Sequence, residues 1–583
     1  MDPMVHARHD TYAQTMRASS KVHTPAARPD AILRGGNGAA QVEPLVSDSP
    51  WWKTAVIYQI AVPSFADSDG DGRGDLRGII GKLDYLNDGT DGSLGVDAIW
   101  LTPINASPLR DFGYDVTDYR AIDPRFGTMD DFEELLGACH RRGMRVMMDL
   151  VLNHTSDEHP WFVESRSSRD DPRRDWYVWR DGRAPGKPPN DWLAVVEGSA
   201  WAFDERSGQY YYHAFLPFQP DLNWHNPAVR REMLDVASYW LAKGVDGFRL
   251  DLINFLYEDP QLRDNPLRFG IRPYLTQRHL HDFSQPESLG VARDLRALAD
   301  GFAERALMGE VCTDTPEDCV AYLGDGTDRL HLSFYLDFIR QRWSASGFRG
   351  SVGWLEDHLP AEGWPCYYLD NHDLQRSFTR LGAKGAGEAR ARVAAAMLLT
   401  LRGTPIVYYG QETGMAQSRV PRQAMDDPVG IKFWPLRVGR DGSRTPMQWS
   451  AGPNAGFTTG TPWLPVDRTY VTRNVAAESA DPSSLLSWYR RLIHLRRHTR
   501  ALREGSYRAV GGAPSAVFAY LREASGERVA VLLNFAARSA SVALPADGSR
   551  EWRCLLSTHS PGGARPGATV VLQPYEALLL ENA

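Results

Sequence analysis

The sequence has few cysteines, no excess of positive charge and no long apolar run. Its five cysteines are odd in number and form no Cys-x-x-Cys pair, which argues against a disulfide framework or a cysteine zinc site. With 65 Lys and Arg against 73 Asp and Glu, the net charge of −8 argues against nucleic acid as the main partner. Because neither a membrane-spanning run nor a signal-peptide core is present, we expect a soluble cytoplasmic protein without a membrane partner.

The first 49 residues contain neither Trp nor Phe and are rich in Ala, Arg, Asp, Gly and Pro. Such a segment has little apolar surface to bury, so residues 1–49 are predicted to form a flexible extension. Aromatic residues are plentiful elsewhere, and the whole chain has 18 Trp and 23 Tyr. They fit either a large core or surfaces that stack on sugars, and composition does not decide between the two.

Eight short apolar runs follow residue 50 and alternate with helical patterns. The runs cover residues 55–60, 96–101, 145–152, 245–250, 305–308, 331–336, 366–369 and 405–409. Amphipathic stretches at 130–142, 227–243 and 388–401 each end near a glycine suited to a helix C-terminus. Eight repeats of strand and helix predict an α/β fold, the (β/α)₈ TIM barrel.

Two segments depart from this alternation. Residues 155–224, after the third strand, are too long for a simple loop and predict an inserted subdomain. Residues 502–583 contain alternating stretches separated by turn residues, which predicts a C-terminal antiparallel β-sandwich domain. The barrel is therefore expected to comprise residues 50–154 and 225–501.

Polar residues close four of the apolar runs. They are Asp149 and His154 at the end of the third run, Arg249 and Asp251 at the end of the fourth, Glu310 after the fifth, and Asp370, His372 and Asp373 after the seventh. One acid after a strand is most simply a helix cap or an ion-pair partner. Acids, histidines and an arginine at four strand ends, which face the active-site mouth of a barrel, point to catalysis by carboxylates.

These residues lie in motifs that resemble a known family. The strings DLVLNH (149–154), GFRLD (247–251), GEV (309–311) and NHD (371–373) resemble the four signature regions of the α-amylase family of glycoside hydrolases. They occur in the family's order, and the resemblance covers residues 51–583. It implies retaining chemistry on α-glucosides in a barrel with an inserted domain B and a β-sandwich domain C.

The resemblance also implies roles for three acids. By motif position, Asp251 is the nucleophile, Glu310 the general acid/base and Asp373 the third carboxylate, which holds sugar hydroxyls. Retaining chemistry needs the first two carboxyls about 5–5.5 Å apart. Arg249 lies two residues before Asp251 on one strand and is expected to keep it ionised, whereas an apolar setting should raise the pKa of Glu310. His154 is expected to bind hydroxyls of the non-reducing glucose, as is the histidine of NHD.

A further string, DFGYDV (111–116), resembles an element that shapes the glucose pocket. The resemblance implies that Tyr114 stacks on the terminal glucose, that Asp115 binds its outer hydroxyls and that Arg444 pairs with Asp115. In exo-acting α-glucosidases such a pair closes the pocket; without the resemblance, the two residues would be read as a surface ion pair. The segment 427–435 also resembles bacterial α-glucosidases that act on short substrates.

Acids alternate with small residues in DSDGDGRGD (67–75). The string resembles the start of an EF-hand loop, but its twelfth position is Gly78 rather than Glu and a strand precedes it, so an EF-hand is excluded. Four clustered carboxylates repel one another without a cation, and the resemblance implies a structural Ca²⁺ or Mg²⁺. The expected ligands are the side chains of Asp67, Asp69, Asp71 and Asp75 and the carbonyl of Arg73.

The substrate linkage is left open by Leu252, because relatives commonly carry a smaller residue after the nucleophile. Residues 254–266 resemble α-1,4-specific enzymes, so maltose-like substrates are favoured. We expect an exo-acting α-glucosidase for short α-glucosides, active as a monomer or homodimer. The alternatives are transglucosylation, trehalose synthase, isomaltulose synthase, sucrose hydrolase and, remotely, a non-catalytic transporter-associated module.

Overall fold

The computed structural model describes residues 49–582 except residues 197, 271, 314, 383–384, 437–438, 546–550 and 560–561. Apart from Ser49, the predicted N-terminal extension lies outside the described residues. No helix in the described part of the chain is long and apolar enough to cross a membrane. The five cysteines all lie in the described part of the chain, and none of them forms a disulfide there.

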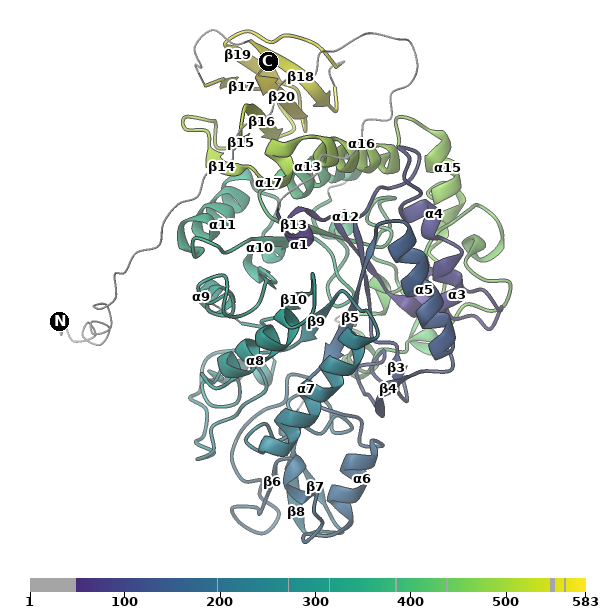
Figure 1. Cartoon of the computed structure of the whole chain (residues 1–583), viewed down its shortest axis with the longest axis vertical. Coiled ribbons are helices and arrows are strands. Elements are labelled where there is room, and N and C mark those ends of the chain that lie inside the picture. Colours follow the sequence, from purple (N-terminus) through teal and green to yellow (C-terminus); the bar gives the residue numbers. More distant parts are fainter. Residues whose placement is uncertain are drawn as a thin grey trace, which may run out of the picture. The chain divides into compact units, whose positions relative to one another are not determined.

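Eight parallel strands form the central sheet, in the order β11-β10-β9-β5-β2-β1-β13-β12. They are β1 (Ile57–Ile60), β2 (Ala98–Leu101), β5 (Arg145–Val151), β9 (Gly247–Asp251), β10 (Ala306–Gly309), β11 (Leu332–Ser333), β12 (Cys366–Tyr368) and β13 (Thr404–Tyr408). Each lies within or overlaps one of the predicted apolar runs, so the predicted TIM barrel is confirmed. In Figure 1 the helices lie around these strands.

The longer barrel helices are α5 (Met129–Arg141), α7 (Pro227–Ala242), α8 (Ser288–Asp300), α11 (Ala345–His358), α13 (Gly387–Thr400) and α16 (Leu485–His498). Helix α5 begins with a capping box in which Thr128 and Asp131 satisfy each other's backbone N–H groups. Gly143 and Gly244 follow α5 and α7 with positive φ, as expected for glycines that end helices.

Shorter elements fill the connections between barrel strands and helices. The helices are α1 (Trp51–Thr54), α2 (Val62–Phe65), α3 (Leu76–Ile80), α4 (Leu83–Leu86), α9 (Pro316–Ala321), α10 (Leu336–Arg340), α12 (Ser377–Arg380), α14 (Pro428–Lys432), α15 (Val475–Ala480) and α17 (Arg500–Glu504). A two-stranded sheet joins β3 (Asn105–Ala106) to β4 (Asp118–Ile122).

The side chains inside the barrel alternate along each strand with those that face the helices. The buried interior cluster includes Ile57, Trp100, Met147, Met308 and Ile406. Side chains two residues apart on a strand share a face, so the next inward positions after Ile57 and Met147 are polar residues at the carboxyl ends. The barrel therefore ends in a polar layer above an apolar core.

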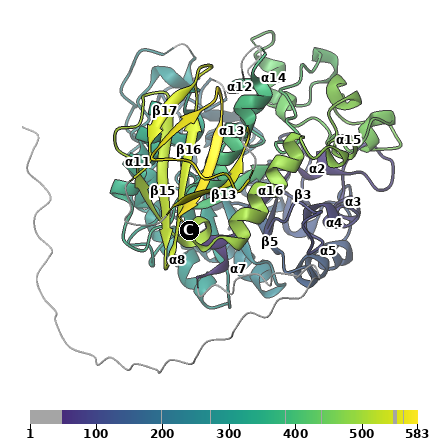
Figure 2. The same ribbon diagram turned by 90° about the horizontal axis from the view of Figure 1, so that it is seen from above.

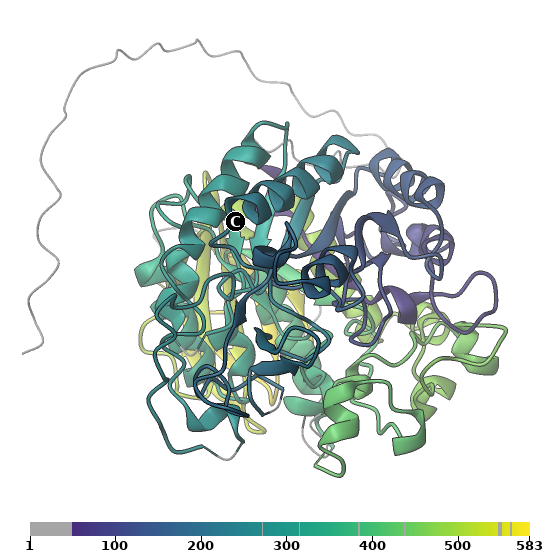
Figure 3. The same cartoon turned by 90° about the horizontal axis from the view of Figure 1, so that it is seen from below.

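The predicted insertion contains α6 (Pro160–Ser167) and a three-stranded sheet of β6 (Trp179–Arg180), β8 (Gln209–Tyr212) and β7 (Trp201–Asp204). Its core is largely aromatic and includes Trp192, Trp201 and Tyr212. Much of the aromatic surplus is therefore core. Figure 3 shows this blue domain in front of the barrel in the view from below.

The C-terminal domain is antiparallel, as predicted. Its larger sheet has the order β14-β15-β16-β20-β18, and β17 pairs with β19; Figure 2 shows these yellow strands from above. The strands are β14 (Ser506–Ala509), β15 (Val517–Ala524), β16 (Glu527–Asn534), β17 (Ala540–Ala543), β18 (Trp552–Ser557), β19 (Thr569–Leu572) and β20 (Ala577–Asn582). Helix α13 packs on β16, which joins this domain to the barrel.

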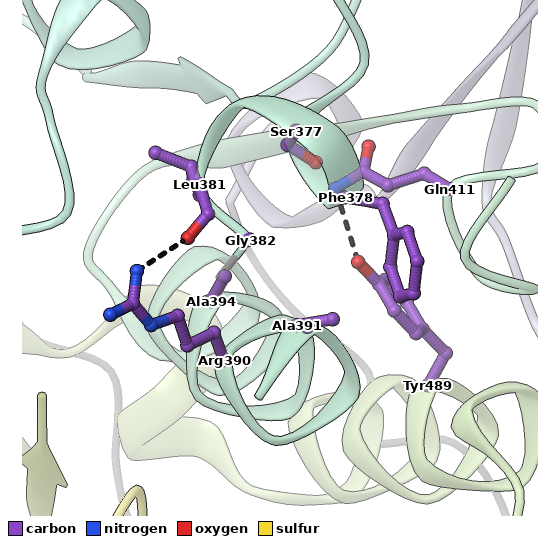
Figure 4. A pocket seen from close by; sticks show the side chains of 10 residues that line it. Ser377, Phe378, Leu381, Gly382, Arg390, Ala391, Ala394, Gln411 and Tyr489 are labelled. Carbon is purple, nitrogen blue, oxygen red and sulfur yellow. Dashed lines mark hydrogen bonds between the residues drawn. The ribbon is translucent and has the colours of Figure 1, made fainter. Parts of the chain in front are cut away.

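A small cavity lies between α12 and α13 (Figure 4). Its walls are held by a hydrogen bond from Arg390 Nη1 to the Leu381 carbonyl and another from Gln411 Nε2 to Tyr489 Oη. A volume of about 10 Å³ leaves room for roughly one water molecule. This cavity is therefore not a substrate site.

Candidate active site

Arg249 joins three carboxylates at the carboxyl end of the barrel. The residue is fully buried. Its Nη1 lies 2.5 Å from Asp149 Oδ1 and 2.6 Å from Asp251 Oδ1, and its Nη2 contacts Glu310 Oε2. The sequence predicted that Arg249, Asp251 and Glu310 meet, and the structure brings them together.

Strand register explains this meeting. Strand β5 pairs with β9 so that Asp149 lies opposite Arg249 and Val151 opposite Asp251. Strand β10 pairs with the other side of β9, with Gly309 opposite Leu250, which puts Glu310 one step beyond, beside Asp251. Residues two apart share a face, so Arg249 and Asp251 both point inward.

Burial raises the pKa of Asp251 well above its ordinary value, and the Arg249 guanidinium opposes that rise. Burial likewise raises the pKa of Glu310 to about 6, as predicted, again against the charge of Arg249. The charge of Arg249 acts on the pKa of Asp251 in the expected direction, and ionisation of Asp251 at neutral pH stays a prediction. One guanidinium is shared by three buried carboxylates, so its charge cannot hold all three ionised at low cost.

Asp373 has the opposite electrostatic setting. Its Oδ1 lies 3.0 Å from Arg444 Nη2 and 3.4 Å from Arg440 Nη1, and its Oδ2 lies 3.0 Å from His372 Nε2. Burial acts to raise the pKa of Asp373, but His372, Arg440 and Arg444 together lower it below its ordinary value. This carboxylate is therefore ionised at neutral pH.

His372 is held as a neutral imidazole. Burial lowers its pKa to about 3, against the attraction of Asp373. Its Nδ1 lies 2.8 Å from Gln59 Nε2, and its Nε2 lies 2.8 Å from Tyr114 Oη. The rings of Tyr114 and His372 are stacked, with centroids 5.4 Å apart and planes 6° apart. The Tyr114 hydroxyl also donates to Asp149 Oδ2, so both predicted residues join the carboxylate cluster.

Gln219, which the sequence analysis did not single out, lies in the same polar layer. Its Nε2 is 3.2 Å from His154 Nε2 and 3.1 Å from Asp111 Oδ2. Gln219 Oε1 and Asp251 Oδ2 are buried without a hydrogen-bond partner among the described residues. Such atoms are costly to bury without a partner, so the hydrogen-bonding capacity of these two acceptors is unused within the described residues.

The predicted pair of Asp115 and Arg444 is wrong. Asp115 is fully buried, and its carboxylate accepts hydrogen bonds from Ser107 Oγ and from the backbone N–H groups of Arg110 and Asp111. Its ionic partner is Arg110, with Nε 3.5 Å from Oδ2. Asp115 therefore organises its own loop, and Arg444 pairs with Asp373 instead.

The pair at this position is Asp111 with Arg440, whose Nη2 contacts Asp111 Oδ1. The same Nη2 lies 2.8 Å from Asp427 Oδ1. The loop turns between the two acids, because Phe112 and Gly113 both have positive φ, and so Asp111 and Asp115 point in different directions. Arg440 and Arg444 lie four residues apart in the sequence, and spacing alone could not choose between them.

Three of the four acids predicted to bind a metal come together. One carboxylate oxygen from each of Asp67, Asp69 and Asp71 lies within 4.8 Å of the others. Oxygen donors of this kind suit a hard cation such as Ca²⁺ or Mg²⁺. Asp75 is directed elsewhere, since its oxygens accept hydrogen bonds from Ser68 and from the Gly78 N–H at the start of α3.

Known proteins resemble this chain over most of its length. The family model for the alpha amylase catalytic domain matches residues 59–505, and that for the maltogenic amylase C-terminal domain matches residues 507–579. A probable alpha-glucosidase of Rhizobium meliloti (strain 1021) is 43% identical over 516 residues, covering 86% of this chain and 92% of that protein. An oligo-1,6-glucosidase of Parageobacillus thermoglucosidasius is 38% identical over 564 residues, covering 90% and 98%.

Two solved structures are similar throughout the fold. The α-glucosyl transfer enzyme XgtA is 43% identical, with a TM-score of 0.86 over 92% of this chain and 100% of that chain. The trehalulose synthase MutB of Pseudomonas mesoacidophila MX-45 is 36% identical, with a TM-score of 0.83 over the same shares. The chain is therefore a glycoside hydrolase that belongs to the α-amylase family.

Proposed function

We propose that this enzyme is an exo-acting, retaining α-glucosidase that releases one glucose from the non-reducing end of short, maltose-like α-glucosides. The observation that carries the proposal is the position of Arg440, which contacts both Asp373 and Asp111. The ion pair with Asp111 thus stands directly beside the catalytic carboxylates. We infer that this pair closes one end of the glucose pocket, so that one terminal sugar enters and a longer chain cannot pass through.

The two buried carboxyls at adjacent strand ends support a double displacement. Asp251 attacks the anomeric carbon while Glu310 donates its proton to the glycosidic oxygen, so that the C1–O bond breaks and a β-glucosyl ester forms on Asp251. Glu310, now a carboxylate, takes a proton from a water molecule while the water oxygen attacks C1 and the ester bond to Asp251 breaks. Glucose leaves in the α configuration, Asp251 is regenerated and Glu310 is protonated again.

The surrounding residues bind and orient the sugar. Asp373 is the ionised acceptor for hydroxyl groups, and neutral His372 beside it is a hydrogen-bonding partner. The buried Oε1 of Gln219, which has no hydrogen-bond partner among the described residues, is a further acceptor near His154. Tyr114 provides an aromatic wall against the ring of the terminal glucose.

The preference for α-1,4 linkages rests on the segment that follows the nucleophile. Leu252 has a φ of 45° and packs at the edge of the apolar cluster that includes Phe255. We propose that its side chain narrows the space beyond the scissile bond and so limits the leaving groups that fit. Because the relatives carry both α-glucosidase and oligo-1,6-glucosidase names, the linkage must be measured directly.

The test compares maltose, isomaltose, sucrose, trehalose and an aryl α-glucoside as substrates. NMR identifies which anomer of glucose the enzyme releases first. We expect maltose to be the best natural disaccharide, with α-glucose appearing before mutarotation. Initial release of β-glucose would exclude retention. Rapid shortening of amylose by internal cleavage would exclude exo action.

Transfer of glucose to a sugar acceptor is a second candidate activity of the same site. It is favoured by the 43% identity to a solved structure described as an α-glucosyl transfer enzyme. A covalent glucosyl-enzyme can be captured by a sugar hydroxyl in place of water, with the same bonds made and broken. Chromatography of products at high maltose concentration separates the two, because a transferase yields new oligosaccharides with little free glucose.

The loop of Asp67, Asp69 and Asp71 is proposed to hold a structural Ca²⁺ or Mg²⁺. When bound, the cation supplies positive charge that relieves repulsion among the carboxylates. Asp67 already accepts three hydrogen bonds from the backbone N–H groups of Asp69, Gly70 and Gly72, so the loop has the shape needed before a cation binds.

A further inference from the structure

A second group of metal-binding side chains lies outside the active site. His494 and His498 are one helical turn apart on α16, and Asp91 lies in the loop between α4 and β2. One nitrogen from each histidine and one oxygen of Asp91 all lie within 4.8 Å of one another. Residues four apart on a helix share a face, which is why both imidazoles reach the same loop.

The orientation of His494 is suited to a metal ligand. Its Nε2 lies 3.1 Å from the Ser93 carbonyl, which accepts the ring N–H. That hydrogen bond leaves Nδ1 with a free lone pair, and Nδ1 is 3.3 Å from Asp91 Oδ1. Histidines that bind metals commonly donate their second N–H to a backbone carbonyl in this way.

The distance between the two ligand atoms also fits. Two ligands bound to Zn²⁺ at about 2.0–2.1 Å with tetrahedral angles lie about 3.3–3.4 Å apart. The Nδ1–Oδ1 separation of 3.3 Å matches this spacing. The His494 ring packs closely on Gly95, where an added Cβ would lie only 2.7 Å from Cε1. This packing holds the imidazole in place.

The position in the fold separates this group from catalysis. Asp91 precedes β2 and so lies at the amino end of the barrel strands, whereas Asp251 and Glu310 close the carboxyl ends of β9 and β10. Helix α16 packs against α13 and leads into α17 and the C-terminal domain. A metal here would tie the β1–β2 connection to α16.

We propose that Asp91, His494 and His498 form a structural site for a transition-metal dication, with Zn²⁺ as the expected ion. Two imidazoles and one carboxylate favour Zn²⁺, Co²⁺, Ni²⁺ or Cu²⁺ over Ca²⁺ and Mg²⁺, which prefer oxygen ligands. Water completes the coordination as a fourth ligand. A plain ion pair between His494 and Asp91 would give His498 no part in the site.

The test measures Zn²⁺ binding to the full chain by calorimetry, with Ca²⁺ present at saturating concentration. Variants His498→Ala and Asp91→Asn are compared with His358→Ala, which removes a helix histidine that is not part of this group. Because the chain has 16 histidines, the site is defined by the difference between variants. The parent and His358→Ala should bind one more equivalent of Zn²⁺ than His498→Ala, or bind it at least about tenfold more tightly.

Two further readouts complete the experiment. Co²⁺ should give tetrahedral absorption bands with the parent that are lost in His498→Ala and Asp91→Asn. Zn²⁺ should raise the Tm of the parent but not of these variants, whose α-glucosidase activity should remain at the parent level. Equal Zn²⁺ stoichiometry and affinity in the parent and His498→Ala would overturn the proposal and leave the group as an ion pair only.

Discussion

Arg249 Nη1 lies 2.6 Å from Asp251 Oδ1, and this contact connects the proposed nucleophile to the other buried acids. The same nitrogen also contacts Asp149, and Nη2 contacts Glu310. Removal of the guanidinium would therefore leave three buried carboxyls without their common cation. The stability and the chemistry of the site both depend on this one side chain.

Replacement of Arg249 by Met should make stability depend strongly on pH. Breaking a buried ion pair costs about 3–5 kcal/mol because the remaining charge is uncompensated. Without Arg249 the folded-state pKa values of Asp251 and Glu310 should rise further above their unfolded values. The variant should then be most stable at acidic pH and lose stability as pH rises through those raised values.

Urea unfolding of Arg249→Met at about pH 5 and about pH 8 measures this dependence. Arg249→Lys, which keeps the charge but not the two-nitrogen contact, serves as the matched control and should lose less stability. A loss of stability equal at both pH values would contradict the shared-cation account.

Loss of the acid proton should set the alkaline side of the activity profile. Burial raises the pKa of Glu310 to about 6, so the protonated form, which donates to the leaving group, disappears as pH rises through about 6. We expect kcat/KM for maltose to fall across that range. Glu310→Gln should lower kcat for maltose by about 10²–10⁴-fold.

An aryl α-glucoside with an acidic leaving group provides the control for this assignment. Such a substrate needs little help from the acid, so Glu310→Gln should retain more activity on it than on maltose. For formation of the glucosyl-enzyme, the pH profile of this variant should lack the fall in rate at alkaline pH. If the limb near pH 6 persists in Glu310→Gln, another group must carry the proton.

The barrel and its polar layer could be predicted from the sequence, because side chains two residues apart on a strand point to the same face. Once one inward-facing residue of a strand is known, the next inward-facing residue is known as well. Ile57 and Met147 lie in the apolar core, and two residues further along the strands the polar side chains of Gln59 and Asp149 begin the site. The alternation along each strand thus predicts both the side chains that fill the barrel and the acids that lie at its carboxyl end.

Three features of the site could not be derived from such a pattern. Asp111 and Asp115 flank the same motif, and their directions depend on backbone turns with positive φ at Phe112 and Gly113. Gln219 reaches His154 only through the fold of the inserted domain. Neither the sharing of Arg249 by Asp149 nor its effect on pKa is visible from residue spacing.

Substitution of Asp111 and Asp115 should separate recognition from loop stability. Asp111→Ala removes one of three carboxylates that contact Arg440, and Asp427 and Asp373 still compensate its charge. A hydrogen bond to a charged group contributes about 1.5–3 kcal/mol, so kcat/KM for maltose should fall by a corresponding factor. Asp115→Asn should instead destabilise the fold by about 1–3 kcal/mol, because its carboxylate accepts several buried hydrogen bonds.

Steady-state kinetics and urea unfolding on both variants check this division. Activity on maltohexaose relative to maltose should rise in Asp111→Ala, since the closed end of the pocket is opened. A larger kinetic defect in Asp115→Asn than in Asp111→Ala, at equal stability, would restore the pairing expected from sequence.

Chelation of Ca²⁺ should affect stability rather than catalysis. A ligand that binds only the folded state at 100 times its Kd stabilises it by about 2.7 kcal/mol. Ca²⁺ should therefore raise the Tm of the parent and of Asp325→Ala, an acid in a comparable turn, but not of Asp67→Ala. A kcat that falls in EDTA well below the Tm would point to a catalytic rather than structural ion.

Linkage preference should change when Leu252 is shortened. Its side chain follows the nucleophile directly and lies at the edge of the cluster that includes Phe255. Residue 252 has a φ of 45°, a conformation that is strained for any residue with a Cβ but not for glycine. Leu252→Ala keeps the Cβ, so this substitution shortens the side chain without relieving the backbone strain. Removal of the apolar wall should weaken discrimination between leaving groups, and the ratio of kcat/KM for maltose over isomaltose should move towards one by about tenfold.

Leu262→Ala is the matched control, because Leu262 also has positive φ, at 53°, and packs on the same apolar cluster without following the nucleophile. Initial rates of glucose release from maltose and isomaltose give the ratio for each variant. If both variants lower kcat/KM equally for the two sugars, Leu252 supports the loop and does not select the linkage. Both variants perturb stability and the packing of the cluster. If the ratio of kcat/KM for maltose over isomaltose changes only in Leu252→Ala, the linkage is therefore selected by the side chain that follows Asp251.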